Sequence, residues 1–521
     1  MKYYSLRSLI ALVSLMLAAV SLCQANNPYE SDWTPTPVGE IDRLVGKELL
    51  SRGIEGAKPA SEEVFFRRAF LDITGTIPPP QAYRKYLKIE PESRRGALIE
   101  ALMGTEAFDD YWTLKWSDLL RIKAEFPINL WPNGVQAYHR WIRQAVATNM
   151  PYDEFARHLL TSSGSNFRVP AVNFYRAIEG QKPETIASAV SLTLMGVRFS
   201  NWSVGQQSDM ANIFSRVAFK KTDEWKEEIV FLDPGQYSPL EITFPDGTQV
   251  IIPTGEDPRS AFANWLIRPD NPWFVRNLVN RAWFWLMGRG LIHEPDDIRN
   301  DNPPVNPALL AYLESEFVES DYDIKHIFRL ILNSRTYQQS SIPQSDHPEA
   351  TSLFAHYMVR RLDAEVLFDA LTVLGGQGEI YQSPVPEPFT FVPEYNRTIE
   401  LSDGSITSQF LEKFGRPARD TGLELERNNE FSVDQSMYLL NSSEVQKRIR
   451  NSRRLRGIAR QAKRNPGKSI EELYGLVLSR PPTQQELTFA KSYPGVRAGK
   501  REAFDDLCWA LINSKEFLYR H

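Results

Sequence analysis

Cysteine is almost absent from this sequence of 521 residues, which contains only two, Cys23 and Cys508. Cys23 lies at the end of a candidate signal peptide, so cleavage after that segment would leave Cys508 alone. One cysteine allows no intrachain disulfide, no cysteine-based zinc site and no Cys-x-x-Cys-His attachment of haem c. Cys508 lies among apolar residues at helical spacing in "FDDLCWALI", which favours a buried structural thiol over a nucleophile.

Familiar catalytic motifs are also lacking. The sequence contains no G-x-S-x-G nucleophile elbow, no phosphate-binding loop and no H-E-x-x-H zinc motif. Its seven histidines are scattered, and no pair of carboxylates has flanking residues that mark it as a glycosidase pair. The net charge of −5 gives no indication of a nucleic-acid partner. We therefore predict no cofactor and no metal.

Long apolar runs are confined to the N-terminus. Lys2 and Arg7 precede an apolar stretch from Leu9 to Cys23, and the small residues near Ala25 permit cleavage before Asn26. We predict a signal peptide over 1–25 and a periplasmic or extracellular protein; acylation of Cys23 and an uncleaved anchor are the alternatives. The best later run, "IASAVSLTLMGV", has twelve residues, which suits a buried helix and not a membrane span.

Helical periodicity dominates the rest of the chain. Apolar residues recur at spacings of three and four in segments such as "SEEVFFRRAFLDITG", "GVQAYHRWIRQAVATN" and "SDMANIFSRVAF". The period changes over 228–252, where "EIVFLD", "LEITF" and "TQVIIP" are typical of strands and Pro245-Asp246-Gly247 indicates a hairpin turn. The sequence predicts a mainly α fold with two helical domains, 26–225 and 257–521, joined by a small antiparallel β-hairpin region, 226–256.

The stretch "GRGLIHEPDDIRNDNPP" holds the first polar cluster, formed by His293, Asp296, Asp297 and Arg299. Such side chains can bind a divalent metal, but Pro295 divides the cluster and no metal-binding spacing is present. We favour a structural turn after a Gly-Arg-Gly helix stop. In it Asp296 or Asp297 would cap the following turn and Arg299 would pair with a carboxylate.

A second cluster lies in "FGRPARDTGLELERNNE", where three arginines alternate with acids: Arg416, Arg419, Asp420, Glu424, Glu426 and Arg427. Arginines on a loop can hold a carboxylate, a sulfate or a phosphate, so these residues are candidate ligand-binding groups. The alternative, which we favour, is an ion-pair network that fixes a long loop.

A third feature is the basic run "QKRIRNSRRLRGIARQAKR" at 446–464, because no acid occurs between Glu444 and Glu471. Such a run can bind an anionic polymer or an anionic lipid. The commoner interpretation, which the negative net charge supports, is a solvated helix face that answers acids elsewhere in the chain. Nucleic acid is not expected for an exported protein.

Several stretches resemble the planctomycete cytochrome-associated proteins. "RRAFLDITGTIPP" resembles the opening of the domain of unknown function 1549. "DPRSAFANWLIRPDNPWFVRNLVNRAWFWLMGRGLIHEPDDIRNDNPP" is similar to the domain of unknown function 1553, and "RRLDAEVLFDAL" and the arginine-rich loop continue the match. The resemblance implies an exported protein of a family whose function is unsettled. Many members carry haem c motifs, and neighbouring genes for sulfatase-like proteins imply a link to polysaccharide breakdown.

The chain departs from these relatives at two places. Many relatives have a Cys-x-x-Cys-His motif after the helix that corresponds to 191–197, but here no cysteine or histidine lies between Gly196 and Met210. Many also have Cys-x-Cys where this chain has Leu423 and Leu425. The protein therefore cannot attach haem c in that way. The joint absence leads to the hypothesis that the two sites cooperate in relatives that bear haem.

Three function classes remain, and we favour the first because no organised acid–base pair is visible. It is a non-haem binding or scaffold protein of the periplasm or cell surface, whose tryptophan-rich helices and basic run contact a glycan or an exported partner protein. The second is a hydrolase or lyase acting on an anionic polysaccharide, with Arg416, Arg419 and the acids of their loop at its site. A redox role through a partner's haem is the third. The oligomeric state is not predicted.

Overall fold

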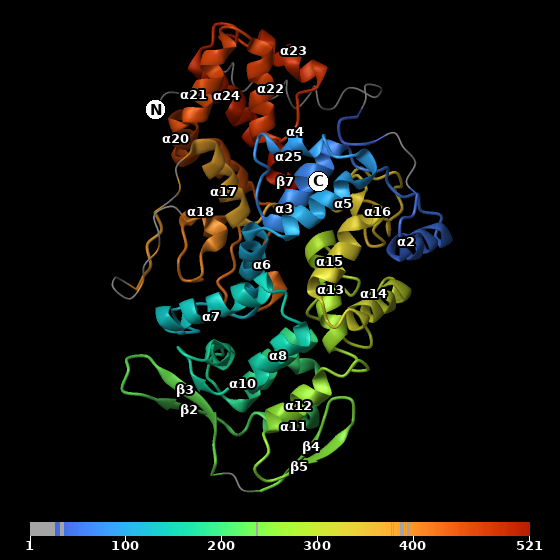
Figure 1. Ribbon diagram of the computed structural model, residues 1–521, viewed down its shortest axis with the longest axis vertical. Coiled ribbons are helices and arrows are strands. Elements are labelled where there is room, and N and C mark those ends of the chain that lie inside the picture. The colour runs from blue at the N-terminus through green and yellow to red at the C-terminus, as the bar shows by residue number, and fades with distance from the viewer. Residues whose placement is uncertain are drawn as a thin grey trace.

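The structure is a computed structural model that describes residues 27–31, 36–235, 238–376, 378, 380–385, 390, 392 and 396–521. The fold is mainly α, as predicted, with a helical end at α21 to α24 and small β-hairpins at the opposite end (Figure 1). The predicted signal peptide lies outside the described residues. Within the described part, no helix is both long and apolar enough to cross a membrane.

The helices before the hairpins follow the predicted periodicity, and local caps set their ends. Helix α3 begins where the Ser61 hydroxyl accepts a hydrogen bond from the Val64 amide, and it ends at Gly75, whose φ is +60°. The helices are α2 Glu40–Ser51, α3 Glu62–Thr74, α4 Ala82–Tyr86, α5 Pro91–Met103, α6 Glu106–Leu119, α7 Trp131–Ala147, α8 Tyr152–Thr161, α9 Asn173–Arg176, α10 Pro183–Val190 and α11 Val204–Ile213.

The strands form small antiparallel sheets. They are β1 Gly164–Ser165, β2 Val217–Lys221, β3 Glu228–Leu232, β4 Leu240–Thr243, β5 Gln249–Ile252, β6 Arg360–Arg361 and β7 Tyr519–Arg520. The hairpin predicted at the Pro-Asp-Gly turn is confirmed, since β4 pairs with β5 from Leu240 opposite Ile252. The prediction of a helix through 217–219 is wrong. Helix α11 ends at Ile213, and β2 pairs with β3 in a three-stranded sheet, of order β1-β3-β2.

The second helical region begins with α12 and ends near the C-terminus. Its helix α13 stops at Gly288, whose φ of +84° confirms the predicted Gly-Arg-Gly helix stop. The helices are α12 Pro258–Leu266, α13 Phe274–Met287, α14 Pro307–Glu319, α15 Ile324–Asn333, α16 Arg335–Gln338, α17 Ala364–Gly375, α18 Gln409–Lys413, α19 Val433–Asn441, α20 Ser443–Asn451, α21 Arg453–Ala462, α22 Pro466–Val477, α23 Gln484–Ser492, α24 Arg501–Ile512 and α25 Lys515–Leu518.

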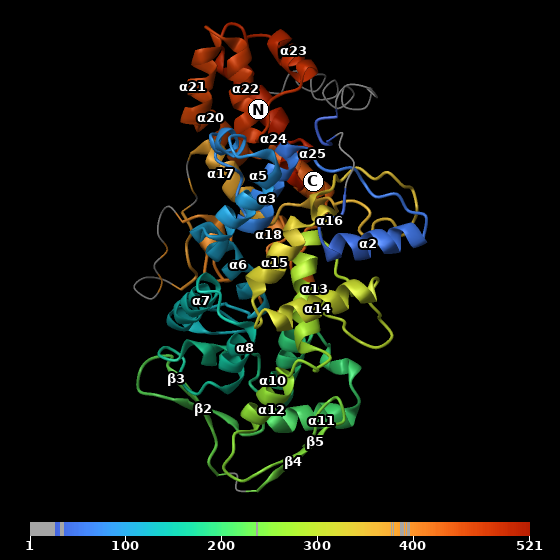
Figure 2. The same cartoon turned by 45° about the vertical axis from the view of Figure 1, so that its right-hand side comes forward.

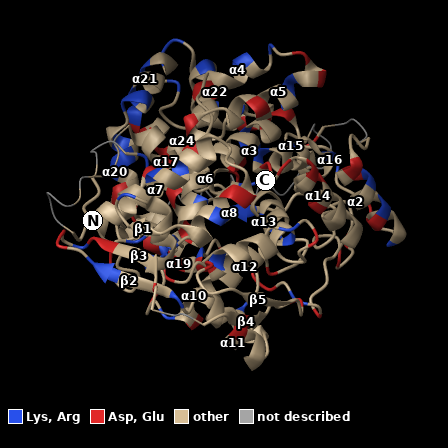
Figure 3. Cartoon of the chain, turned by 60° about the horizontal axis from the view of Figure 1, so that its bottom comes forward, with Lys and Arg blue, Asp and Glu red and all other residues tan. Residues whose placement is uncertain are grey.

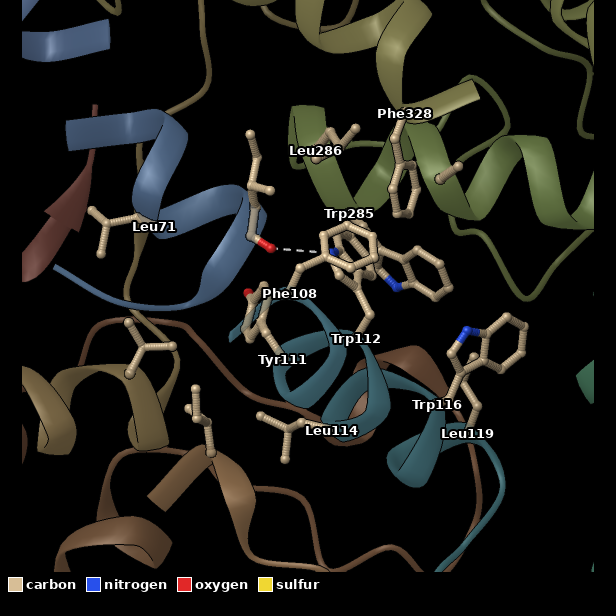
Figure 4. Packing of buried hydrophobic residues seen from close by; sticks show 14 of the residues in the cluster. Leu71, Phe108, Tyr111, Trp112, Leu114, Trp116, Leu119, Trp285, Leu286 and Phe328 are labelled. Atoms are coloured by element: carbon tan, nitrogen blue, oxygen red, sulfur yellow. Dashed lines mark hydrogen bonds between the residues drawn. The ribbon is translucent and has the colours of Figure 1, made fainter. Parts of the chain in front are cut away.

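The tryptophan-rich helices form the core and not a binding face. Trp285 of α13 packs against Trp112 and Trp116 of α6, with ring centroids 5.4 and 5.8 Å apart (Figure 4). Trp283 is fully buried as well. The expectation that these helices contact a glycan is therefore wrong, because their indoles are covered by other side chains. Cys508 is buried in α24, as predicted.

Segments from both ends of the chain pack together. Arg68 of α3 donates to the carbonyl oxygens of Tyr337, at 2.6 Å, and of His521, at 2.9 Å. Strand β6 pairs with β7 next to the C-terminus. The core is one connected cluster that draws on both predicted helical domains, and the predicted boundaries between those domains stay a prediction.

Candidate functional site

The two polar clusters singled out in the sequence meet at Asp296. Arg281 of α13 donates to Asp296 Oδ1 at 2.6 Å, and both side chains are buried. Asp296 Oδ2 accepts the backbone N–H of Glu424 at 2.7 Å, so the turn after α13 is joined to the arginine-rich loop. The Arg281 guanidinium also donates to the Leu192 carbonyl oxygen at 2.9 Å. Asp296 thus joins two loops. The prediction that it caps its own following turn is wrong, because both of its oxygens accept from residues outside that turn.

Glu424 carries a carboxyl group with an unusual protonation equilibrium. Burial raises its pKa to about 7; Asp296 adds to the rise, and Arg281 opposes it. Its Oε1 accepts a hydrogen bond from the indole N–H of Trp285 at 2.9 Å. The group therefore gains and loses a proton near neutral pH at the end of the aromatic core.

The rest of the first cluster contacts the segment 198–201. Asp297 accepts from Asn201 Nδ2 at 3.1 Å and from Arg299 Nε at 3.1 Å. Arg198 pairs with Glu294 at 2.6 Å. Leu423 and Leu425 flank Glu424, whose backbone N–H donates to Asp296. The hypothesis that the sites at 196–210 and 423–425 cooperate in relatives stays a hypothesis.

His293 does not belong to a group of metal-binding side chains among the described residues. The imidazole is half-buried, and burial lowers its pKa, with the Arg289 guanidinium acting in the same direction. Within the described residues, no group of three or more His, Cys, Asp or Glu side chains could hold a metal ion. The cluster around 293–299 therefore acts as a set of contacts between loops.

The three candidate arginines of the loop form ion pairs with carboxylates of the same chain. Arg427 donates to Asp118 Oδ2 at 2.6 Å and to Glu365 Oε2 at 2.7 Å. Arg419 donates to Asp118 Oδ1 at 2.9 Å, and the buried Arg416 lies 3.3 Å from Glu365 Oε1 and donates to the Ile406 carbonyl oxygen. Although burial opposes it, the charge of Arg427 lowers the pKa of Glu365 to about 2.

The candidate acids of the loop are used in the same way. Asp420 pairs with Lys123 at 2.7 Å. Glu426 accepts the backbone N–H groups of Asp420, at 2.9 Å, and of Thr421, at 3.0 Å. The six candidates between 416 and 427 therefore fix the loop to α6, α13 and α17 and to itself, through ion pairs and hydrogen bonds.

Sequence reasoning missed a second buried network behind this loop. Asp363 accepts from Tyr111, Lys115, Arg520 and Asn429, at distances between 2.7 and 3.0 Å. These partners hold the pKa of Asp363 well below its usual range against the opposing effect of burial. The sequence signal that could have indicated this network is Asp363 itself, an acid at the start of an otherwise apolar helix in "RRLDAEVLF".

The open polar site lies elsewhere, at the hairpin end of the molecule. A cavity of about 640 Å³ is lined by residues 127–129, by 176, 178, 180 and 181, and by the β2–β3 connection, 221–228. Trp225 in that connection is 56% exposed and meets the Trp131 ring edge-on, with centroids 4.6 Å apart. Lys226 Nζ lies 5.3 Å from the Trp131 ring centroid. The sequence predicts only a domain boundary here, between 225 and 226.

The charges around this cavity are balanced and held in place. Arg176 pairs with Glu228 at 2.9 Å. Glu227 accepts from the hydroxyls of Ser165 and Thr222, and these hydrogen bonds lower its pKa. The exposed wall adds Lys226 and acids of the β2–β3 connection. Such a cavity offers donors and acceptors to a polar ligand without a strong preference for one sign of charge.

The protein is thus mainly helical, and its polar loops are hydrogen-bonded to each other and to Trp285 of the aromatic core. Residues 40–200 match the model PSCyt2, a protein of unknown function (DUF1549), and residues 258–493 match PSD1, a protein of unknown function (DUF1553). The chain belongs to this planctomycete cytochrome-associated family, with its two domains in that order. The comparisons with curated proteins and with solved structures gave no match.

Proposed function

We propose that the protein is an exported non-haem binding protein of the periplasm or cell surface, and that it binds a glycan in the cavity beside Trp225. The supporting observation is an exposed indole at the edge of a polar cavity of about 640 Å³. A pyranose ring has apolar C–H faces and polar hydroxyl edges. An indole face with hydrogen-bonding groups around it complements both.

The alternative is a hydrolase or lyase acting on an anionic polysaccharide. A glycosidase needs a carboxyl group with a raised pKa to act as general acid. Burial raises the pKa of Asp369 to about 6 and that of Glu424 to about 7, and both residues lie outside the cavity. The arginines proposed for that site, Arg416 and Arg419, already serve internal carboxylates. These observations favour binding.

The test is calorimetric titration of residues 26–521 with a panel of neutral and acidic oligosaccharides. We expect saturable binding of at least one neutral sugar, and Trp225→Ala should weaken it about tenfold, the effect of losing one aromatic contact. Phe431→Ala is the matched control, because Phe431 is an aromatic residue that is 60% exposed and does not line the cavity. It should leave the affinity unchanged.

Two outcomes would overturn the proposal. If no glycan of the panel binds, the protein is a scaffold for another exported protein and not a glycan receptor. If a glycan is turned over and Glu424→Gln abolishes the turnover while binding persists, the hydrolase alternative replaces it. Export itself is tested by locating the mature protein and sequencing its N-terminus, with Asn26 as the expected first residue.

A further inference from the structure

Helices α20 and α21 lie at the end of the molecule opposite the hairpins (Figures 1 and 2), and basic residues are frequent along both (Figure 3). The apolar side of α21, formed by Leu455, Ile458, Ala459 and Ala462, is buried. Eight exposed cations, which we call the cationic face, lie on α20, on α21 or just after it: Lys447, Arg450, Arg453, Arg454, Arg456, Arg460, Lys463 and Arg464. At 1.5 Å per residue, each of the two helices is roughly 15 Å long.

These cations are not paired with acids. Among the residues that the structure describes, none of the eight has a carboxylate partner; Arg450 donates to Gln446 at 3.4 Å and Arg456 to the Asn451 carbonyl oxygen at 3.1 Å. The nearby Glu444 is engaged with Arg448 at 3.0 Å. The prediction of a solvated helix face agrees with the exposure of these cations, but the described residues provide no direct acid partner for them.

Part of the arrangement is unfavourable for the fold itself. Arg456 and Arg460 are four residues apart on α21, where like charges repel. Arg453 and Arg454 occupy the first turn of α21, where the helix dipole disfavours cations. The dipole favours Arg450 and Arg460 in the last turns of α20 and α21, so the stability of the helices accounts for only part of this concentration of charge.

Hydrogen bonds hold the backbone at the joint between α20 and α21. The Ser452 hydroxyl accepts the Leu455 amide at 3.2 Å and caps α21. Arg501 of α24 donates to the carbonyl oxygens of Ile449, at 2.7 Å, and of Ser452, at 3.0 Å, and so fixes the joint between α20 and α21. These contacts fix the backbone positions from which the arginines extend, so a ligand has to order only their side chains.

We propose that this face binds a polysaccharide that carries carboxylate or sulfate groups. The polymer lies along α20 and α21, and its anions accept paired hydrogen bonds from the arginines. The inference does not rest on the glycan cavity, which lies near the hairpins and has balanced charges.

Other polyanions fit this face less well. Neither α20 nor α21 itself exposes a large apolar side chain, and the nearest exposed ones in sequence, Phe431, Val433 and Met437, lie on or just before the preceding helix α19. A helix that binds lipid inserts apolar side chains, a protein interface centres on aromatic or aliphatic anchors, and a single-stranded nucleic acid stacks on aromatic rings. A charged polysaccharide needs none of these.

The test measures binding of residues 26–521 to a uronate polysaccharide, a sulfated polysaccharide and a neutral one at rising salt concentration. The wild type should bind at least one of the charged polymers, and the affinity should fall steeply as salt rises. The triple variant Arg453→Gln, Arg456→Gln, Arg460→Gln should bind about tenfold more weakly or worse, with a shallower dependence on salt.

The matched control is Arg84→Gln, Lys85→Gln, Lys88→Gln, which removes three exposed cations in and next to α4 and changes the net charge equally. It should keep the wild-type affinity, and Trp225→Ala should keep it as well. Equal weakening by both triple variants, loss of binding in Trp225→Ala alone, absence of binding at low salt, or preferential binding to anionic vesicles or to DNA would each overturn the proposal. Circular dichroism verifies that every variant is folded.

Discussion

Two arginine-rich segments of this chain have opposite environments. In the loop at 416–427 the arginines are buried, and Asp118 and Glu365 meet them. On α20 and α21 the arginines are exposed and lack carboxylate partners among the described residues. The sequence patterns differ mainly in their acids, which alternate with the arginines of the loop and are missing from the helices.

A cluster of arginines in a sequence therefore indicates a binding site only when the folded chain provides no carboxylate partners for the guanidinium groups. A buried guanidinium must be neutralised by the chain, because an unpaired charge in the interior is very costly. An exposed one is solvated and stays available to a partner. Substitutions in the two segments should therefore act on different properties, namely the stability of the fold and the affinity for a ligand.

The largest effect is expected from Arg427→Met. The substitution leaves Asp118 and Glu365 buried with one fewer cation, and removing one partner of a buried ion pair typically costs about 3–5 kcal/mol. We expect a loss of this size in the free energy of unfolding, measured by urea denaturation at pH 7. Arg427→Lys keeps the charge but not the forked geometry, so its loss should be smaller. A loss below about 1 kcal/mol for the methionine variant would contradict the assignment of this network as structural.

Much of the fold was visible in the sequence because its causes are local. Apolar residues at spacings of three and four predict most helices, and the Pro-Asp-Gly turn at 245–247 predicts the β4–β5 hairpin. Strand β2 escaped prediction because its pairing with β3 overrides local preference. The residues of "SRVAF" fit a helical pattern as well, and the partner strand lies beyond a polar connection.

The candidate site was less predictable because its partners are far apart in sequence. The residues of both polar clusters were recognised, but their meeting at Asp296 joins positions 128 residues apart. Likewise, Arg419 finds Asp118 across 301 residues. The Trp225 cavity is formed by three separate segments, and each alone reads as a turn. Sequence patterns identify residue types for such sites, whereas tertiary packing decides which of them meet.

An effect of intermediate size is expected in the pH dependence of the free energy of unfolding, to which Glu424 and Glu365 contribute in opposite directions. Burial raises the pKa of Glu424 to about 7, above the value near 4.3 of an unfolded chain. Its contribution to stability is therefore complete below about pH 4 and is lost as pH rises through 7, by about 1–3 kcal/mol. Glu365, whose pKa falls to about 2, acts oppositely: its contribution is present above about pH 4 and is lost toward pH 2.

The variant Glu424→Gln tests this behaviour, because glutamine imitates the protonated acid and can still accept from the Trp285 indole. We expect it nearly to match the wild type at about pH 4 and to be more stable at pH 8, as measured by urea denaturation at both values. An identical pH dependence in the two proteins would mean that Glu424 does not titrate between these values in the folded state.

The smallest effect on stability should come from the exposed face, with Arg456→Gln as the simplest change. It removes the repulsion between Arg456 and Arg460 and breaks only one hydrogen bond to a backbone carbonyl oxygen. The free energy of unfolding should stay within about 0.5 kcal/mol of the wild type, with a slight gain at low salt where the repulsion is least screened. Thermal and urea denaturation at low and high salt measure this directly. A loss of 2 kcal/mol or more would show that the cation has a structural role, and the contrast with Arg427 would then no longer hold. A neutral result gives the cationic face no role in stability, so that any loss of polysaccharide binding in its variants reports on recognition alone.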